Sequence, residues 1–262
     1  MARTVDCHAQ SSSGESSWPA TGDKALDLRA RAAGAAVHLL TASGAVFGLF
    51  ALSESAQHNW SAAFTWLGVA LIVDGIDGPI ARWINVKDAL PRFSGARLDL
   101  VVDYLNYCFV PAFIVVESGL VSERWSALAA GLILISSLFH FADQDSKTHD
   151  GYFVGFPAIW NIICLYIFVL GLGQGLALLA IVVLALMTFV PITWPHPLRV
   201  AGWRFPTYGI AAAWLIAAAV GIHQGFPSSN AVKSVFVVVA IYVIIMGVMR
   251  AWLKDLHAGG EG

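Results

Sequence analysis

Long apolar stretches follow one another through most of this chain, with only short polar segments between them. A helix needs roughly 20 mostly apolar residues to cross a bilayer, and a long apolar run without alternation does not suit a strand. Stretches of this kind lie at residues 35–53, 61–81, 96–118, 125–142, 153–173, 175–194, 207–223 and 232–250. The sequence therefore predicts an all-α integral membrane protein with about eight transmembrane helices.

The polar segments divide the chain into three parts. Residues 1–34 form a polar N-terminal tail, of which residues 1–22 are rich in Ser, Gly and Ala, and residues 251–262 form a short cytoplasmic C-terminal tail. Residues 23–33 suit a short interfacial helix, and a plain N-terminal extension of the first span is the alternative. Because a long polar stretch precedes the first apolar run, we do not expect a secretory signal peptide. Residues 35–250 hold every apolar stretch and make one transmembrane domain.

The basic residues lie mainly on one side of the predicted topology. With the N-terminus in the cytoplasm, thirteen of the fifteen Lys and Arg residues are cytoplasmic, and only Arg124 and Lys233 fall outside. This asymmetry predicts that both termini are cytoplasmic. The formal net charge is −2, which gives no indication of nucleic-acid binding. The three cysteines are too widely spaced to predict a disulfide framework or a zinc site.

Four aspartates stand where the second and third apolar stretches reach the cytoplasmic side. Asp74 and Asp77 are three residues apart, and Asp99 and Asp103 are four apart. On helices each pair shares one face, and two helices joined by a short loop can turn these faces together. Four carboxylates would repel one another at close range, so a hard cation such as Mg²⁺ or Mn²⁺ suits the cluster. The alternative is a set of solvated acids paired with neighbouring arginines.

Small residues and one arginine accompany the aspartates. Gly75, Gly78 and Gly95 have no side chain, so a ligand can approach the backbone closely at these positions. Arg82 follows Gly78 by four residues and suits a phosphate or a carboxylate partner. These residues favour a phosphate-containing ligand beside the predicted metal site.

The same residues form a known signature. The chain reads D-x-x-D-G-x-x-A-R from Asp74 to Arg82 and G-x-x-x-D-x-x-x-D from Gly95 to Asp103, and it thereby resembles the CDP-alcohol phosphotransferases. Twelve residues separate Arg82 from Gly95, a longer interval than in most members. The long interval is similar to that of the bacterial phosphatidylcholine synthase branch. So are three segments: VHLLTASGA at 37–45, DSKTHDGYFVGFPAIWN at 145–161 and HPLRV at 196–200.

This resemblance implies a role for each signature position. The metal ligands would be Asp74, Asp77, Asp99 and Asp103, and Asp103 would also be the catalytic general base. The CDP and phosphate site would comprise Thr41, Gly78, Ala81, Arg82 and Gly95. The implied cofactor is Mn²⁺ or Mg²⁺, as a pair of ions. The implied substrates are CDP-diacylglycerol and choline, used by a multi-pass homodimer in the bacterial inner membrane with its active site on the cytoplasmic side.

Two further sets of residues are candidates for substrate contacts. Choline carries a quaternary ammonium, which aromatic faces suit, and the aromatic candidates are Tyr104, Tyr107, Tyr152, Phe156 and Trp160. The candidates for a lipid phosphate are His196, Arg199 and Arg204. Ordinary packing aromatics and topology-setting charges near lipid head groups are the respective alternatives.

Two other functions share these features. Another CDP-alcohol phosphotransferase, such as a phosphatidylserine synthase, would carry the same signature, because the signature does not identify the acceptor alcohol. A cation transporter would also need intramembrane carboxylates. Transporters place their ion sites near the bilayer midplane, whereas these acids are predicted at the cytoplasmic edge, which argues against that function.

Overall fold

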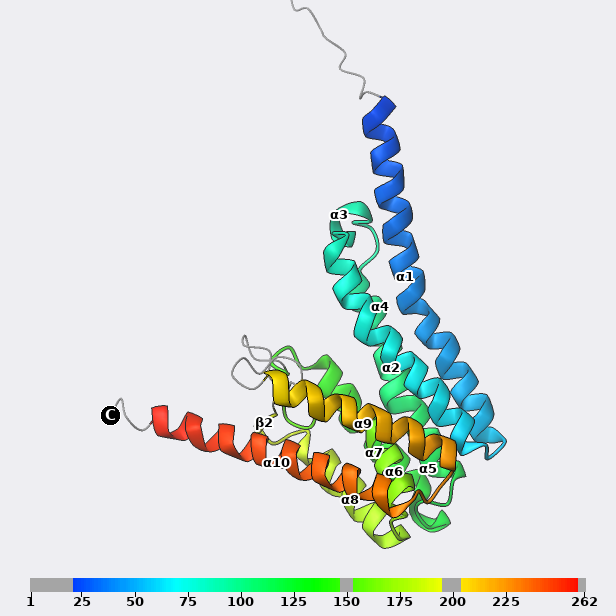
Figure 1. Ribbon diagram of the computed structural model, residues 1–262, viewed down its shortest axis with the longest axis vertical. Helices are drawn as coiled ribbons and strands as arrows, with labels where there is room; N and C mark the ends of the chain where they lie inside the picture. The colour runs from blue at the N-terminus through cyan, green and yellow to red at the C-terminus, as the bar shows by residue number, and fades with distance from the viewer. Residues whose placement is uncertain (1–20, 147–152, 195–203, 259–262) are drawn as a thin grey trace, which may run out of the picture.

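The computed structural model describes residues 21–146, 153–194 and 204–258, and these residues are helical almost throughout (Figure 1). The helices are α1 (Thr21–Ala56), α2 (Trp60–Trp83), α3 (Val86–Ala89), α4 (Gly95–Tyr104), the π-helical turn η1 (Leu105–Phe109), α5 (Val110–Glu117), α6 (Glu123–Ala142), α7 (Trp160–Leu170), α8 (Gln174–Met187), α9 (Arg204–Gln224) and α10 (Asn230–Ala258). In the described residues, the only strands are β1 (Phe153–Val154) and β2 (Thr193–Trp194), which form one short antiparallel pair. The predicted all-α class is confirmed.

Within the part of the chain that the structure describes, six helical segments are long and apolar enough to cross a membrane. They are Leu28–Ala56, Trp60–Trp83, Gly95–Glu117, Glu123–Ala142, Thr207–Gln224 and Asn230–Met249. The third runs through α4, η1 and α5 without a break. Each of the six coincides with a stretch predicted from the sequence. Large apolar side chains such as Leu39, Ile216 and Val238 are exposed on these helices, as expected of surfaces that face lipid.

The other two predicted spans, 153–173 and 175–194, correspond to the shorter helices α7 and α8, so the count of eight is not confirmed. Gly155 and Ala158 have φ angles of 74° and 54°, which a right-handed helix does not allow. A Cβ at Gly155 would collide with the backbone carbonyl of Thr188, so the chain needs glycine there. The segment before α7 therefore runs as β1 and a loop, although its side chains are mostly apolar.

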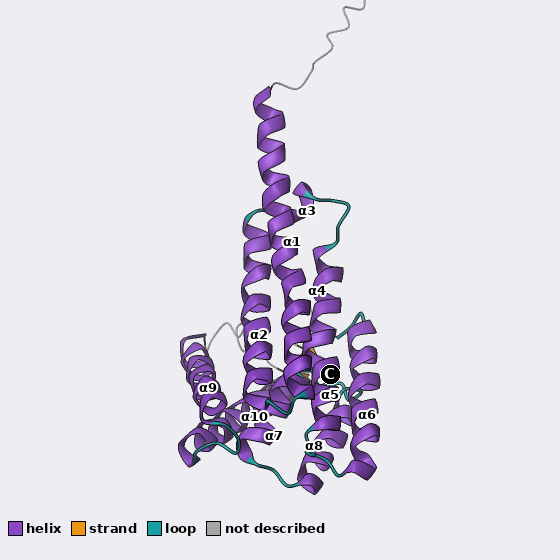
Figure 2. Cartoon of the chain, turned by 90° about the vertical axis from the view of Figure 1, so that its right-hand side faces the viewer, coloured by secondary structure: helices purple, strands orange, loops and turns teal. Residues whose placement is uncertain are grey.

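Helix α1 packs along α2 and also contacts α3, α4, η1 and α5. Figures 1 and 2 show that the N-terminal part of α1, the C-terminal part of α2, α3 and the start of α4 project beyond the remaining helices, whereas α9 and α10 lie away from this projection. Helix α1 is continuous from Thr21, so residues 23–33 extend the first span instead of forming a separate helix. The residues predicted to bind the metal ions and the CDP group lie on α1, α2 and α4.

The core lies largely between α5, α6, α7 and α8. Trp160 is its largest fully buried side chain, and its indole N–H donates a 2.9 Å hydrogen bond to Ser137 Oγ on α6. Apolar residues of the neighbouring helices, including Ile114, Ile133 and Ile181, are also fully buried. The hydrogen bond satisfies the one polar atom of the indole ring within this apolar region.

Candidate functional site

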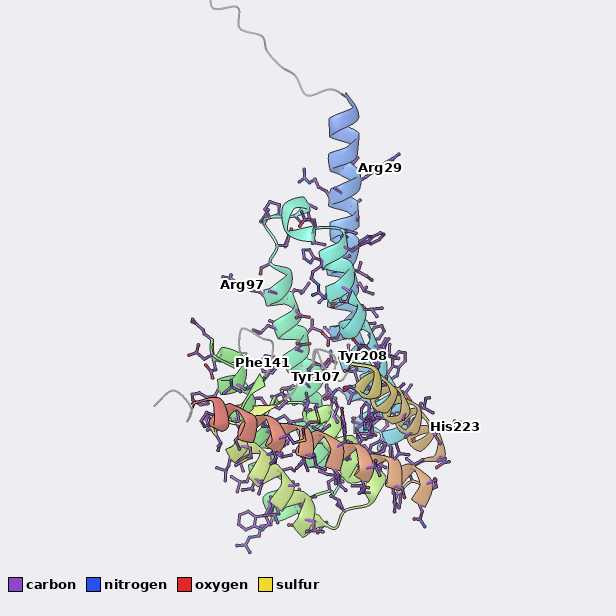
Figure 3. The ribbon with its side chains drawn as sticks, turned by 60° about the vertical axis from the view of Figure 1, so that its left-hand side comes forward. Arg29, Arg97, Tyr107, Phe141, Tyr208 and His223 are labelled. Carbon is purple, nitrogen blue, oxygen red and sulfur yellow. The ribbon has the colours of Figure 1, made fainter. Side chains whose placement is uncertain are left out.

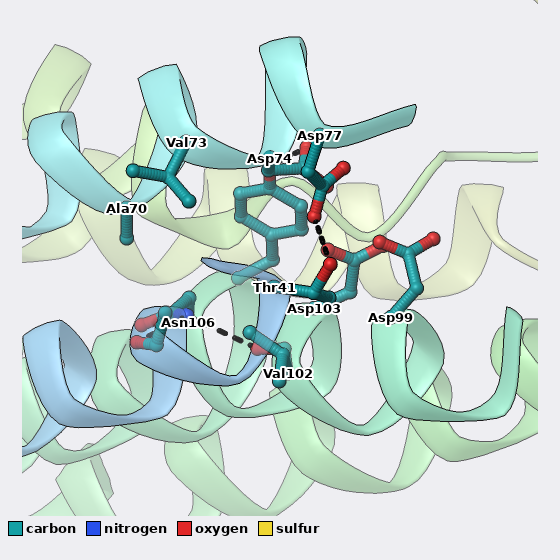
Figure 4. A pocket seen from close by; sticks show the side chains of 11 residues that line it. Thr41, Ala70, Val73, Asp74, Asp77, Asp99, Val102, Asp103 and Asn106 are labelled. Atoms are coloured by element: carbon teal, nitrogen blue, oxygen red, sulfur yellow. Dashed lines mark hydrogen bonds between the residues drawn. The ribbon is translucent and has the colours of Figure 1, made fainter. Parts of the chain in front are cut away.

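Three aspartates from two helices converge beside α1. Asp74 on α2 and Asp99 and Asp103 on α4 each offer a carboxylate oxygen, and these oxygens all lie within 4.8 Å of one another. All three residues are partly buried, and Figure 4 shows them around one small pocket. The helical spacing of the aspartates explains this arrangement, because it places Asp99 and Asp103 one above the other on one face of α4, the face turned toward Asp74.

Asp77 lines the same pocket but is held by α1. Its side chain is buried, and its Oδ2 atom accepts a 2.6 Å hydrogen bond from the hydroxyl of Thr41 (Figure 4). Thr41 Oγ1 also lies 3.3 Å from the carbonyl oxygen of Val37, one turn earlier in α1. The structure thus places Thr41 against an aspartate, and this contact fixes the position of Asp77 next to the three converging carboxylates.

Two polar side chains of η1 complete the wall of the pocket. The hydroxyl of Tyr107 donates a 2.6 Å hydrogen bond to Asp74 Oδ2. Asn106 is buried, and its amide nitrogen donates to the carbonyl oxygens of Gly44 on α1, at 3.0 Å, and of Val102, at 3.1 Å (Figure 4). Sequence reasoning missed Asn106, although an amide in the middle of an apolar span was an available signal.

The C-terminal part of α2, from Gly75 onward, contains two glycines, an alanine and the basic side chain of Arg82. A Cβ at Gly78 would lie 3.5 Å from Arg82 Nη1, and one at Gly75 would meet no atom within 4 Å. Arg82 is exposed, and Ala81 beside it is partly exposed. Pro79 has no N–H to bond to the Gly75 carbonyl one turn earlier. The phosphate-binding role predicted for Gly78, Ala81 and Arg82 stays a prediction.

Gly95, the first residue of α4, is packed against α1. A Cβ at this position would lie only 3.0 Å from His38 Cε1, so glycine allows the two helices to approach closely. The sequence predicted that a ligand approaches the Gly95 backbone, and that contact stays a prediction.

The donor set of the cluster fits a hard divalent cation. Carboxylate oxygens are the ligands that Mg²⁺ and Mn²⁺ take, and three of them in one small volume repel one another unless a positive charge lies between them. Among the residues that the structure describes, Asp74, Asp99 and Asp103 form the only group of acidic, His or Cys side chains placed to hold a metal ion.

The aromatic residues predicted to bind choline do not gather at one place. Tyr107 lines the acidic pocket, whereas the Tyr104 hydroxyl donates to the carbonyl oxygen of Leu134 on α6, at 3.4 Å. Phe156 and Trp160 are buried in the core with their ring centroids 4.9 Å apart. Of these four residues, only Tyr107 therefore contributes to the pocket.

The remaining candidates lie at the limits of the described chain. Tyr152, His196 and Arg199 fall outside the described residues, and Arg204 is the first residue of α9. Arg29 on α1 and Arg97 on α4 are exposed and point away from the helices (Figure 3). The lipid-phosphate role proposed for the three basic residues stays a prediction.

Comparison with known proteins supports the reading of the signature. The family model described as CDP-alcohol phosphatidyltransferase matches residues 36–194. The phosphatidylcholine synthase of Rhizobium johnstonii is 38% identical over 220 residues, which cover 84% of this chain and 91% of that protein. That of Pseudomonas aeruginosa is 42% identical over 188 residues, or 72% of this chain and 79% of that protein. The matched region contains all four aspartates of the pocket, and the chain belongs to the CDP-alcohol phosphatidyltransferase family.

Proposed function

We propose that the protein acts as a phosphatidylcholine synthase, which transfers the phosphatidyl group of CDP-diacylglycerol to choline and releases CMP. The observation that carries this proposal is the acidic pocket, built from signature aspartates in a chain whose relatives bear that name over most of its length. Family membership argues for a transferase and against a cation transporter. It leaves the acceptor alcohol open, and the names of the relatives favour choline.

Asp74, Asp99 and Asp103 would hold Mn²⁺ or Mg²⁺, with Asp77 as a further carboxylate held in place by Thr41. A divalent cation bound there would neutralise the charge of the pyrophosphate and of the departing CMP. Arg82 and the small residues Gly78 and Ala81 would receive the nucleotide phosphates at the open end of α2.

Asp103 is the residue that we assign as general base. The hydroxyl of choline is a weak nucleophile and needs an acceptor for its proton within hydrogen-bond reach. In the proposed step the hydroxyl oxygen forms a bond to the phosphatidyl phosphorus, the bond from that phosphorus to the CMP oxygen breaks, and the proton passes to Asp103. No covalent enzyme intermediate is required.

The positive-inside asymmetry supports a site on the cytoplasmic side of the bacterial inner membrane. The acyl chains of the substrate would then remain in the bilayer while its head group reacts at the boundary with water. The homodimer implied by the resemblance stays a prediction.

The test is an acceptor panel. The purified protein is incubated in detergent with CDP-diacylglycerol, Mn²⁺ and one labelled alcohol: choline, serine, inositol or glycerol phosphate. We expect phosphatidylcholine and CMP in equal amounts, with the other alcohols reacting at least about 10-fold more slowly. A parallel reaction with chelator in place of Mn²⁺ should give no product. Comparable rates with serine and choline would contradict the proposed acceptor, and the absence of product with every alcohol would contradict the proposed activity.

A further inference from the structure

The π-helical turn η1 interrupts the third span directly beside the acidic pocket. The N–H of Val110 bonds to the carbonyl oxygen of Leu105, five residues earlier, so this turn holds one residue more than an α-helical turn. Pro111 follows the turn, and it has no N–H to bond to the Tyr107 carbonyl as an α-helix would require. The π-turn therefore lies where Pro111 already prevents a regular α-helical hydrogen bond.

The wider turn changes the direction of the side chains that follow it. In a regular α-helix each residue turns by about 100°, so Tyr107 would lie about 40° around the axis from Asp103 and about 80° from Asp99. Residues in a π-turn each rotate by a smaller angle, which brings Tyr107 back toward the face that carries Asp99 and Asp103. From that face the Tyr107 hydroxyl reaches Asp74 on the neighbouring helix, at 2.6 Å.

The same turn is also attached to α1. Asn106 donates a hydrogen bond to the Gly44 carbonyl at 3.0 Å, and a Cβ at Gly48 would lie only 2.6 Å from Asn106 Oδ1. Glycine at position 48 therefore lets the buried Asn106 side chain lie directly against the α1 backbone. The turn is held between α1, through Asn106, and Asp74 of α2, through Tyr107.

We propose that Tyr107 is a positioning residue of the metal site, whose hydroxyl fixes the orientation of the Asp74 carboxylate toward the cation. The inference rests on the metal-binding part of the proposed function and gives Tyr107 a role that differs from the predicted choline contact. Hydrogen bonds from a neighbouring side chain to a metal-binding carboxylate orient that carboxylate and keep it from rotating away from the metal ion. Their loss typically costs about 10- to 100-fold in metal affinity.

The experiment measures Mn²⁺ binding to the full chain, purified in detergent without substrates, by electron paramagnetic resonance. Tyr107→Phe removes the hydroxyl and keeps the ring, and we expect the Kd for Mn²⁺ to rise about 10- to 100-fold. Tyr104→Phe is the matched control, because it also removes a tyrosine hydroxyl from the third span. The Tyr104 hydroxyl contacts the Leu134 carbonyl oxygen and not the acids. We expect that variant to bind Mn²⁺ as the wild type does.

A double-mutant cycle separates positioning from general packing. In an Asp74→Asn background the carboxylate is absent, so adding Tyr107→Phe should leave the Kd nearly unchanged. Three results would each overturn the inference. The losses of Mn²⁺ affinity from Asp74→Asn and Tyr107→Phe could be additive, the Kd of Tyr107→Phe could equal that of the wild type, or Tyr104→Phe could lose as much affinity as Tyr107→Phe. Tyr107→Leu replaces Tyr107→Phe if the latter does not fold.

A wild-type protein that does not bind Mn²⁺ would overturn both the metal proposal and this inference. One that binds Mn²⁺ but makes no phosphatidylcholine would overturn the proposed acceptor or activity alone.

Discussion

Asp77 and Asp103 belong to one signature but occupy different environments. Asp77 is only 5% exposed and accepts a hydrogen bond from Thr41, whereas Asp103 is partly buried and lies within the group of three converging carboxylates. A buried carboxylate depends on its hydrogen-bond partner, because an unmade bond there is costly. Substitutions near the two residues should therefore act in different ways.

Asp103→Asn should lower turnover by about 10²- to 10⁴-fold, the usual cost of losing a general base. An amide cannot accept the proton of the choline hydroxyl, so excess Mn²⁺ should not restore the rate, and CDP-diacylglycerol should still bind. The measurement is a Mn²⁺ titration of the variant that follows both turnover and lipid binding. If turnover recovers at high Mn²⁺, Asp103 acts as a metal ligand and another group takes the proton.

Thr41→Val removes the hydroxyl that holds Asp77 while nearly keeping the side-chain volume. We expect turnover to fall about 10- to 100-fold, as for other contacts that orient a metal ligand. Thr41→Ser is the control, because it retains the hydroxyl, and it should keep most of the activity. Initial rates of the two variants at saturating Mn²⁺ make the comparison. Equal rates for both would show that the 2.6 Å contact does not matter for catalysis.

At the scale of elements, the close contact between α1 and η1 depends on a glycine of α1, Gly48, which lies against Asn106 of η1. A methyl group at Gly48 would lie 2.6 Å from Asn106 Oδ1, whereas one at Gly68 on α2 would meet no atom within 4 Å. Gly48→Ala should therefore lower the free energy of unfolding by about 1–3 kcal/mol through overpacking. Gly68→Ala should leave it unchanged or raise it by about 0.5–1 kcal/mol, since Ala favours a helix over Gly.

Thermal unfolding in detergent, with Gly68→Ala as the matched variant, tests this contact. A melting temperature for Gly48→Ala at or above that of the wild type would mean that α1 and η1 can separate without cost. The contact would then not hold the turn that carries Tyr107.

At the scale of the whole molecule, the charge asymmetry predicts the orientation of the chain in the membrane. Arg92 lies in the loop between α3 and α4, and Glu123 begins α6 at the opposite end of the third and fourth spans; both are exposed. In intact cells, an impermeant maleimide should label Glu123→Cys, and it should label Arg92→Cys only after permeabilisation. Variants of Cys7, Cys108 and Cys164 provide the unlabelled background. The reverse labelling pattern would place the acidic pocket on the outer side.

The sequence by itself was sufficient for the membrane class, the family and the set of aspartates. Length and apolarity identify a spanning helix without any knowledge of its neighbours, because the bilayer sets the same requirement for every span. Likewise, spacings of three and four residues place Asp74 with Asp77 and Asp99 with Asp103 on common helix faces. Both properties are local, and a local pattern can be read directly from the chain.

Contacts between distant residues were decided only by the tertiary structure. Thr41 and Asp77 are 36 residues apart, and their hydrogen bond depends on how α1 packs along α2. Tyr107 lies four residues after Asp103, so helical spacing places it near the face of the aspartates. Its hydrogen bond to Asp74, 33 residues earlier in the chain, depends on how α2 and the third span are placed. Phe156 and Trp160, aromatic like Tyr107, lie in the core. An aromatic residue of the core and one of the site can be of the same type, so the sequence does not distinguish them. Only the contacts that the fold gives each side chain do so.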